Sequence, residues 1–192
     1  MRTLLFLLIF CPGLLHAQEV TSHSRPTFIV GISFHAVSTP FHKPWNNFRN
    51  LGFKVGAEIP WNSKDNLRQS IELGYYVNEL NGRSVYVHSD LVYRPKIIEE
   101  VRVDFRIGPG LGFIVAPGET YMQNGGLWTR SHGGKWFPQV HGGVGIAYND
   151  VKAKSIEASP FLQYEVMAIV GYNRGIPVLP NSFIHVGSKM KF

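Results

Sequence analysis

Cysteine is nearly absent from this chain. The one cysteine among its 192 residues is Cys11, and it lies in an apolar segment close to the N-terminus. That segment has a basic start at Arg2, an apolar run over Leu4–Phe10 and a small residue, Ala17, before the first polar stretch. We expect residues 1–17 to be a secretory signal peptide that is removed after Ala17. A mature chain without thiols excludes disulfide frameworks and thiolate metal sites.

The sequence also lacks an apolar run of the roughly 20 residues that a transmembrane helix needs, since Leu4–Phe10 is far shorter. Apolar residues make up 44% of the chain, and the mean hydropathy is close to zero. A protein with one apolar and one polar face has these averages, because the two faces cancel. The net charge of +6 comes from basic residues that are spread along the chain without a basic block. We therefore expect no nucleic acid among the partners.

Apolar residues alternate with polar residues or glycine along eight segments, which is the period of β-strands. The segments are 28–36, 51–61, 67–77, 85–94, 101–115, 136–148, 156–170 and 183–192. Most of them reach the roughly 9 to 11 residues that a tilted strand needs to cross a bilayer. The sequence therefore predicts an all-β fold, an eight-stranded antiparallel up-and-down transmembrane β-barrel over residues 27–192. Residues 18–26 are expected to form a polar periplasmic leader.

Two features of the pattern indicate that the apolar face points to lipid rather than inward around a ligand, as it would in a lipocalin-like barrel. Glycines fall almost entirely on the polar face, where a crowded lumen needs small residues. Aromatic residues lie near the ends of the segments, where they would form two girdles at the membrane interfaces. The girdle residues are Phe28, Trp61, Tyr93, Tyr148 and Phe192 on one side, and Phe34, Tyr75, Phe113, Trp136 and Tyr172 on the other.

The alternating segments, the Gly-Pro-Gly-Leu-Gly-Phe stretch at Gly108–Phe113 and the final Lys191-Phe192 pair resemble the small outer-membrane β-barrels of Gram-negative bacteria, the OmpA-like, OmpX-like and porin-family proteins. The resemblance implies a location in the cell outer membrane, with Phe192 as the sorting signal. With the termini in the periplasm, the short connections face inward and the longest one, Ala116–Lys135, lies outside. Because the likeness is one of pattern, it implies a fold and a location and very little function.

Charged residues on the polar face nearly balance. They are the cations Lys54, Arg68, Arg94, Arg102, Arg106, Lys189 and Lys191 and the carboxylates Glu58, Glu72, Asp90, Asp104, Glu157 and Glu165. Eight strands leave an interior just wide enough for side chains, and a lone desolvated charge is costly. We therefore expect ion pairs to fill the lumen, and the functional alternative is a gated ion path or a proton relay. The expected links run from Arg102, Asp104 and Arg106 to Glu58, Glu72 or Glu165.

Lipid A deacylases and palmitoyltransferases are enzymes built on barrels of this size, and the deacylases use a His and a Ser on the lipid-facing side of a strand. The histidines of the eight segments all fall on the polar face instead, at His35, His88, His141 and His185. The adjacent His88 and Ser89 must point to opposite sides of their strand. The remaining candidates, Ser131 and His132 with Glu119, lie in a glycine-rich loop, which gives a catalytic group little support. We therefore assign no catalytic residue.

Metal ligands are not indicated either. The histidines are scattered, without the close and regular spacing of a metal site. His88, Asp90 and His141 would come together only after folding, and nothing in the sequence indicates that they do. We therefore expect no metal and no cofactor.

The predicted outer loops carry aromatic residues and arginine, which is the composition of a binding surface. The candidates are Trp45 in the first loop and Tyr121, Trp128 and Arg130 in the longest one. For Trp45 the composition favours a place in the girdle at the lipid headgroups, whereas for Trp128, in the middle of its loop, the two interpretations weigh equally. We therefore predict a non-enzymatic envelope protein, structural or binding through its outer loops, whose partners are outer-membrane lipid, including lipopolysaccharide, and another outer-membrane protein. The alternatives are a lipid A acyl hydrolase or acyltransferase, and a small-solute pore.

Overall fold

The structure is a computed structural model that describes most of the chain outside its N-terminal segment. The described residues are 25–39, 44–62, 64–79, 82–95, 101–118, 120–124, 126–131, 133–148, 151–153, 156–173 and 175–191. The expected signal peptide at 1–17, most of the expected leader at 18–26 and the sorting residue Phe192 lie outside these ranges. They stay predictions from the sequence.

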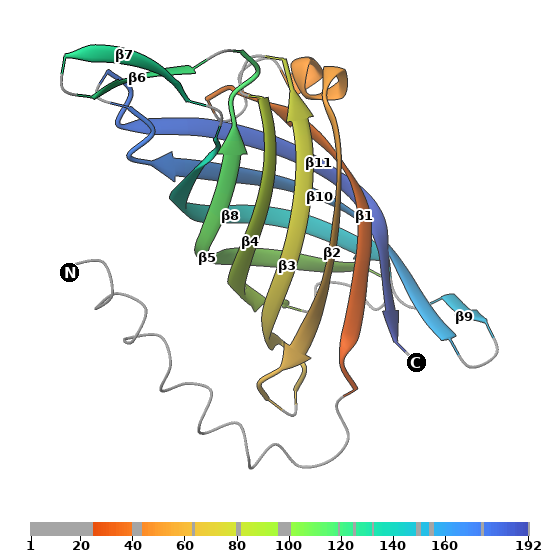
Figure 1. Ribbon diagram of the computed structural model, residues 1–192. Coiled ribbons are helices and arrows are strands. Elements are labelled where there is room, and N and C mark those ends of the chain that lie inside the picture. The colour runs from red at the N-terminus through yellow and green to blue at the C-terminus, as the bar shows by residue number, and fades with distance from the viewer. Residues whose placement is uncertain are drawn as a thin grey trace.

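Eight long strands form a closed antiparallel barrel (Figure 1). Their bounds are β1 Thr27–Ala36, β2 Leu51–Pro60, β3 Leu67–Asn78, β4 Gly82–Tyr93, β5 Val101–Val115, β8 Lys135–Tyr148, β10 Ile156–Val170 and β11 Val178–Lys191. Each strand pairs with the next along this series, and β11 pairs with both β10 and β1, which closes the sheet. The predicted eight-stranded up-and-down architecture is therefore confirmed. β11 begins at Val178, before the Phe183 that the alternation indicated.

Four short elements lie between the long strands. They are the 3-10 helix η2 Pro44–Arg49, β6 Thr120–Asn124, β7 Leu127–Ser131 and β9 Val151–Ala153. Helix η2 and the β6–β7 pair lie at one end of the barrel, called here the loop end, and β9 lies at the other, called the proximal end (Figure 1). The proximal end is where β1 begins and β11 ends. Among the described residues, no helix is long and apolar enough to cross a membrane.

The segment Ala116–Lys135 was expected to be a loop, and this is wrong for its centre. Strands β6 and β7 form a hairpin with an antiparallel register that runs from Thr120 opposite Ser131 to Asn124 opposite Leu127. The connection is only two residues long and contains Gly126 at a φ of 86°, a left-handed conformation that two-residue hairpin turns require and that glycine adopts at little cost. A glycine pair between two short segments is a hairpin signal that could have been recognised in the sequence.

The alternating pattern divides the sheet into an apolar outer face and a polar inner face. On β3, Ile71 and Leu73 point outward with 53% and 49% of their surface exposed, whereas Glu72 between them is fully buried in the lumen. Large apolar side chains are exposed on the outer face of every long strand, which makes a continuous belt around the barrel. Charges inside and hydrophobic residues outside are the arrangement of a barrel that sits in lipid, not of a ligand-enclosing soluble barrel.

Glycines on β5 make room for side chains that reach across the lumen from neighbouring strands. A Cβ atom on Gly110 would lie 2.7 Å from Nε2 of His141, and one on Gly112 would lie 2.0 Å from Nε2 of Gln139. Both distances are closer than van der Waals contact allows. The Gly-Pro-Gly-Leu-Gly stretch is therefore the inner wall against which the His141 and Gln139 side chains of β8 lie.

The belt generates a depth-dependent prediction. Leu73 lies at the middle of β3, so replacing it by arginine is expected to destabilise the barrel by about 2 to 4 kcal/mol, because the charge sits at the bilayer midplane. The matched control is Leu67→Arg on the same strand, where Leu67 pairs with the girdle residue Tyr93, and about 0 to 1 kcal/mol is expected there. Reversible urea unfolding in lipid vesicles measures both values. Equal losses at the two depths would contradict the membrane position of the belt.

Candidate functional site

The lumen is filled by charged side chains in equal numbers. Among the described residues that are buried there, five are cations and five are carboxylates. The cations are Lys54, Arg68, Arg94, Arg106 and Lys189, and the carboxylates are Glu58, Glu72, Asp90, Asp104 and Glu165. Each is at most 5% exposed. Such burial is tolerated because every charge faces an opposite one, whereas removing a single partner leaves a desolvated charge.

A proximal layer of the network is centred on two carboxylates and three cations. Oε2 of Glu58 accepts from Nη2 of Arg94 at 2.8 Å and lies 3.2 Å from Nε of Arg68, and Oε1 of Glu58 accepts from Nζ of Lys189 at 2.7 Å. Asp104 accepts from Nη2 of Arg94 at 2.9 Å and also contacts Lys189. Among its buried members this layer carries one more positive than negative group, and Arg68 also binds the half-buried Asp65 of the β2–β3 turn.

A central layer has the opposite balance, with three carboxylates and two cations. Nζ of Lys54 lies 2.7 Å from Oε2 of Glu72 and 3.9 Å from Oε2 of Glu165. Arg106 binds Glu72 and approaches Oδ2 of Asp90 to 3.8 Å. Arg106 joins the two layers, because its Nη2 atom also lies 3.3 Å from Oε1 of Glu58 in the proximal layer.

Two residues that the sequence assigned to this network lie elsewhere. Arg102 and Glu157 are half-buried at the proximal rim, and Nη1 of Arg102 lies 3.9 Å from Oδ2 of Asp65 in the β2–β3 turn. The expected link from Arg102 to a lumen carboxylate across the barrel is therefore wrong, because Arg102 is the first inward position of β5 and its side chain sits at the mouth. The expected link from Asp104 to a lumen carboxylate is also wrong, because Asp104 is itself a carboxylate and pairs with the cations Arg94 and Lys189.

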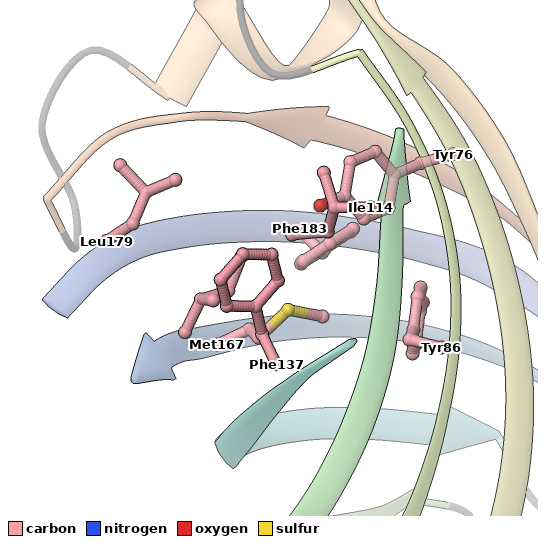
Figure 2. Close-up of a cluster of buried hydrophobic side chains, with 8 residues drawn as sticks. Tyr76, Tyr86, Ile114, Phe137, Met167, Leu179 and Phe183 are labelled. Atoms are coloured by element: carbon pink, nitrogen blue, oxygen red, sulfur yellow. The ribbon is translucent and has the colours of Figure 1, made fainter. Parts of the chain in front are cut away.

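An apolar cluster fills the lumen towards the loop end, where the sequence indicated only a polar face (Figure 2). Its members are Tyr76, Tyr86, Ile114, Phe137, Met167, Ile169, Leu179 and Phe183. The rings of Tyr76 and Tyr86 lie 5.5 Å and 5.8 Å from that of Phe183, between centroids. Tyr172, expected in the lipid girdle, packs on Phe137 at 5.6 Å instead. The lumen is thus blocked by ion pairs in its proximal and central parts and by aromatic rings towards the loop end.

Four histidines within the described ranges line the lumen, and one of them, His185, belongs to a row of side chains that sequence reasoning missed. Nδ1 of His185 lies 2.8 Å from Oγ of Ser33, and its Nε2 lies 3.3 Å from Oε2 of Glu165. A Ser–His–Glu row is the order of an activated nucleophile, but all three side chains are fully buried and face no space for an acyl substrate. Ser33 and His185 pair only where β1 meets β11, so no local sequence signal exists for them.

The enzyme candidates of the sequence are only partly described. Ser131 is the last residue of β7, and His132 and Glu119 lie outside the described residues. His88 and Ser89 point to opposite sides of β4, as expected: His88 is buried in the lumen, and Oγ of Ser89 donates to the backbone oxygen of Ser70. The described strands therefore present no Ser–His pair to lipid.

The loop end carries an excess of exposed cations. Arg49, Arg83, Arg130 and Lys135 are exposed there, and Glu79 is the one exposed carboxylate among the described residues of that end. Of the predicted interaction residues, Trp45 is 79% exposed on η2. Tyr121 and Trp128 lie in the hairpin, where the register sets Tyr121 opposite Arg130 and Gln123 opposite Trp128.

An apolar groove lies on the outer wall directly below η2. It has a volume of about 530 Å³ and is lined by apolar side chains of β1, β2 and β3, with Arg49 and Glu79 at its upper edge. Its apolar lining residues are Ile32, Leu51, Phe53, Tyr75 and Val77. Above it, Phe48 packs on Phe34 with ring centroids 5.0 Å apart. A groove of this kind at the membrane interface fits a lipid chain, with a cation at the headgroup level.

Comparison with known proteins identifies the fold. No protein-family model matches the chain, and a comparison with curated proteins gives no match. Neisserial surface protein A has a similar structure, with a TM-score of 0.53 over 89% of this chain and 98% of its own, at 12% identity. Ail of Yersinia pestis gives 0.48 over 89% and 100%, at 13% identity, and the N-terminal barrel domain of Pseudomonas aeruginosa OprF gives 0.46 over 87% and 99%, at 12%.

The predicted fold class is therefore confirmed: the chain is a small barrel of the outer-membrane type, closed by eight strands. The lipid-facing belt and this closed β-architecture locate it in the cell outer membrane, because closed β-barrels with an apolar exterior are the spanning structures of that membrane.

The hub position of Glu58 gives a stability prediction. Glu58→Gln leaves Arg94 and Lys189 with Asp104 alone, and Arg68 with the half-buried Asp65. A loss of about 3 to 5 kcal/mol in unfolding free energy is therefore expected. The matched control is Glu157→Gln at the half-buried rim, where a change within about 0.5 kcal/mol is expected. Urea unfolding in vesicles measures both. A neutral effect of Glu58→Gln would show that the network is not coupled as its distances indicate.

The filled lumen predicts that the barrel does not conduct. Planar-bilayer recordings of the purified protein are expected to show no reproducible open channel, because side chains occupy the lumen over its length. The double variant Tyr86→Ala with Phe183→Ala opens part of the apolar cluster but leaves the ion pairs, so it is expected to stay closed as well. A stable conductance in the unmodified protein would contradict the filled lumen.

Proposed function

We propose that this chain is a non-enzymatic envelope protein that acts by binding through its loop end, with the closed barrel as a rigid support. A lumen filled by side chains leaves no path for solutes, which argues against the small-solute pore. The remaining surfaces are the lipid-facing wall and the two ends. Of these, the loop end has the exposed aromatic and cationic composition of a contact surface.

The observation that carries the proposal is the β6–β7 hairpin at the loop end (Figure 1). Alternate residues of a two-stranded ribbon share a face, so Tyr121, Gln123, Trp128 and Arg130 occupy one face by their register. Aromatic residues and arginine are the residue types that dominate binding energy at protein interfaces. A paired ribbon also holds these positions in a fixed relation to each other, which a flexible loop does not.

Lipopolysaccharide is the lipid partner that fits the rest of the loop end. The exposed cations Arg49, Arg83, Arg130 and Lys135 surround the barrel mouth at the level where anionic headgroups lie. Arginine binds phosphate with paired, charge-assisted hydrogen bonds. The groove below Arg49 adds an apolar surface for an acyl chain. The aromatic residues of the hairpin, Tyr121 and Trp128, are then left for a protein partner.

Removing the rim charges tests the lipid contact. The quadruple variant Arg49→Gln, Arg83→Gln, Arg130→Gln and Lys135→Gln is expected to bind lipopolysaccharide at least about tenfold more weakly, since four exposed charge contacts of about 0.5 kcal/mol each sum to that loss. The matched control is Arg25→Gln with Lys64→Gln at the proximal end, which is expected to leave binding unchanged. Titration of lipopolysaccharide into barrels held in neutral phospholipid discs measures both.

Two further readouts separate the proposal from its alternatives. Co-purification in mild detergent should show a partner that is lost in Trp128→Ala and kept in Trp136→Ala, a tryptophan on the barrel wall. Mass spectrometry of lipid A should show the same acyl pattern with and without the gene. An altered acyl pattern that depends on His132 would overturn the non-enzymatic assignment. If the loop end can be altered without any loss of binding, the interaction proposal fails.

A further inference from the structure

Four metal-ligand side chains converge in the central layer of the lumen, although they come from three different strands. His88 and Asp90 lie on β4, His141 on β8 and Glu165 on β10. Nδ1 of His141 lies 2.8 Å from Nδ1 of His88 and 2.8 Å from Oε1 of Glu165. Nδ1 of His88 lies 3.8 Å from the same Glu165 oxygen and 3.6 Å from Oδ1 of Asp90. Two imidazole nitrogens and the Glu165 oxygen therefore surround one point, and the Asp90 carboxylate lies beside it, next to His88.

Strand β5 allows this convergence because it contributes no side chain there. It lies between β4 and β8, and its residue Gly110 pairs with His88 on one side. A Cβ atom on Gly110 would lie 2.7 Å from Nε2 of His141 and 3.0 Å from Cβ of His88, and one on Gly108 would lie 2.6 Å from Oδ1 of Asp90. The two glycines thus leave the space in which the imidazoles and the Asp90 carboxylate meet.

Protons alone satisfy this arrangement poorly. If Nδ1 of His141 carries a hydrogen, it can donate that hydrogen to Nδ1 of His88 or to Oε1 of Glu165, but not to both. The atom that does not accept it then lies 2.8 Å from Nδ1 of His141 without a hydrogen bond. If Nδ1 of His141 is unprotonated, its lone pair faces the Glu165 carboxylate. A cation at the shared point removes this conflict, because both nitrogens and the carboxylate oxygen act as electron-pair donors to it.

The other ring nitrogens are placed as metal-bound histidines require. Nε2 of His141 lies 3.2 Å from Oε1 of Gln139, and Nε2 of His88 lies 3.4 Å from Oε2 of Glu72. In protein metal sites, the nitrogen that does not bind the ion donates to a carboxylate or a carbonyl, which fixes the ring orientation. Each imidazole therefore presents Nδ1 to the common point. On the far side, Nε2 of His141 is hydrogen-bonded to Gln139, whereas Nε2 of His88 faces the Glu72 carboxylate without a hydrogen bond.

Asp90 and the charge balance provide independent support. Asp90 is fully buried, and within the described part of the chain neither of its carboxylate oxygens receives a hydrogen bond. A buried carboxylate without donors is costly unless a cation compensates it. The central layer also holds three carboxylates against two cations, Lys54 and Arg106. This layer, unlike the barrel interior as a whole, therefore has an excess negative charge, and two of its three carboxylates belong to the four converging side chains.

We propose that His88, His141, Glu165 and Asp90 form a binding site for a divalent first-row transition ion, with zinc as the first candidate. Two imidazoles with two carboxylates make a donor set that suits zinc and disfavours calcium and magnesium, which take oxygen ligands. Ligands about 2.0 Å from a tetrahedral ion are about 3.3 Å apart, so the two Nδ1 atoms would separate slightly from their 2.8 Å spacing. The ion enters as the barrel folds, because side chains fill the lumen at both ends.

The test refolds tag-free protein in the presence of Co²⁺ or Zn²⁺ and then washes it with a chelator, which strips ions from the surface but not from the filled lumen. The unmodified barrel is expected to retain about one ion per chain by elemental analysis, and the cobalt form should show the visible absorption of tetrahedral nitrogen and oxygen coordination. His141→Gln and the isosteric Asp90→Asn are expected to lose most of the retained metal and this absorption.

The matched control is His35→Gln, which changes another buried lumen histidine. His35 is held by Asn181 and Asn78 through hydrogen bonds of 2.8 Å and 3.1 Å and is not one of the four converging residues, so this variant should retain metal like the unmodified barrel. Heat-modifiable gel migration verifies that each variant folds. If the unmodified barrel retains no ion, or if His141→Gln and Asp90→Asn retain as much as His35→Gln, the site does not exist.

Discussion

The desolvation of ten charged side chains is the constraint on which the interior of this barrel depends. Five carboxylates and five cations lie in a lumen that side chains fill, so each of them must find an opposite charge within the barrel. Glu58 satisfies this condition for several partners at once, since it contacts cations from β3, β5 and β11 and also Arg94, which directly follows β4. The strand register is therefore tied to charge pairing as well as to backbone hydrogen bonds.

The number of strands, the face of the sheet that each residue occupies and the position in the membrane could be derived from the sequence, because all three depend on a period of two. Residues such as Glu72 between Ile71 and Leu73 assign both faces of a strand without any knowledge of its neighbours. The apolar cluster was missed although Tyr86 and Phe183 occupy inward positions of that same period. Their residue type was read as part of a polar face, whereas the lumen near the loop end is lined by aromatic rings.

Contacts between strands that are remote in the chain could not be derived in the same way. His88 and His141 meet across β5 only because Gly110 lies between them, and Ser33 meets His185 only where the first and last strands pair. Such contacts depend on the register of three or more strands at once, and a shift of one residue would reverse the facing of each. The rim position of Arg102 has a related cause, since the depth of a residue in the lumen depends on strand stagger.

The pairing of Lys189 with Glu58 and Asp104 has a consequence for how the barrel assembles. Lys189 lies on β11, so the carboxylates of the proximal layer lack this partner until the last strand docks between β10 and β1. Closure of the sheet and neutralisation of the interior are then a single event. An intermediate with seven strands would expose both unpaired strand edges and an uncompensated carboxylate, so it gains little stability before the final strand arrives. Assembly is expected to be cooperative for an electrostatic reason as much as a topological one.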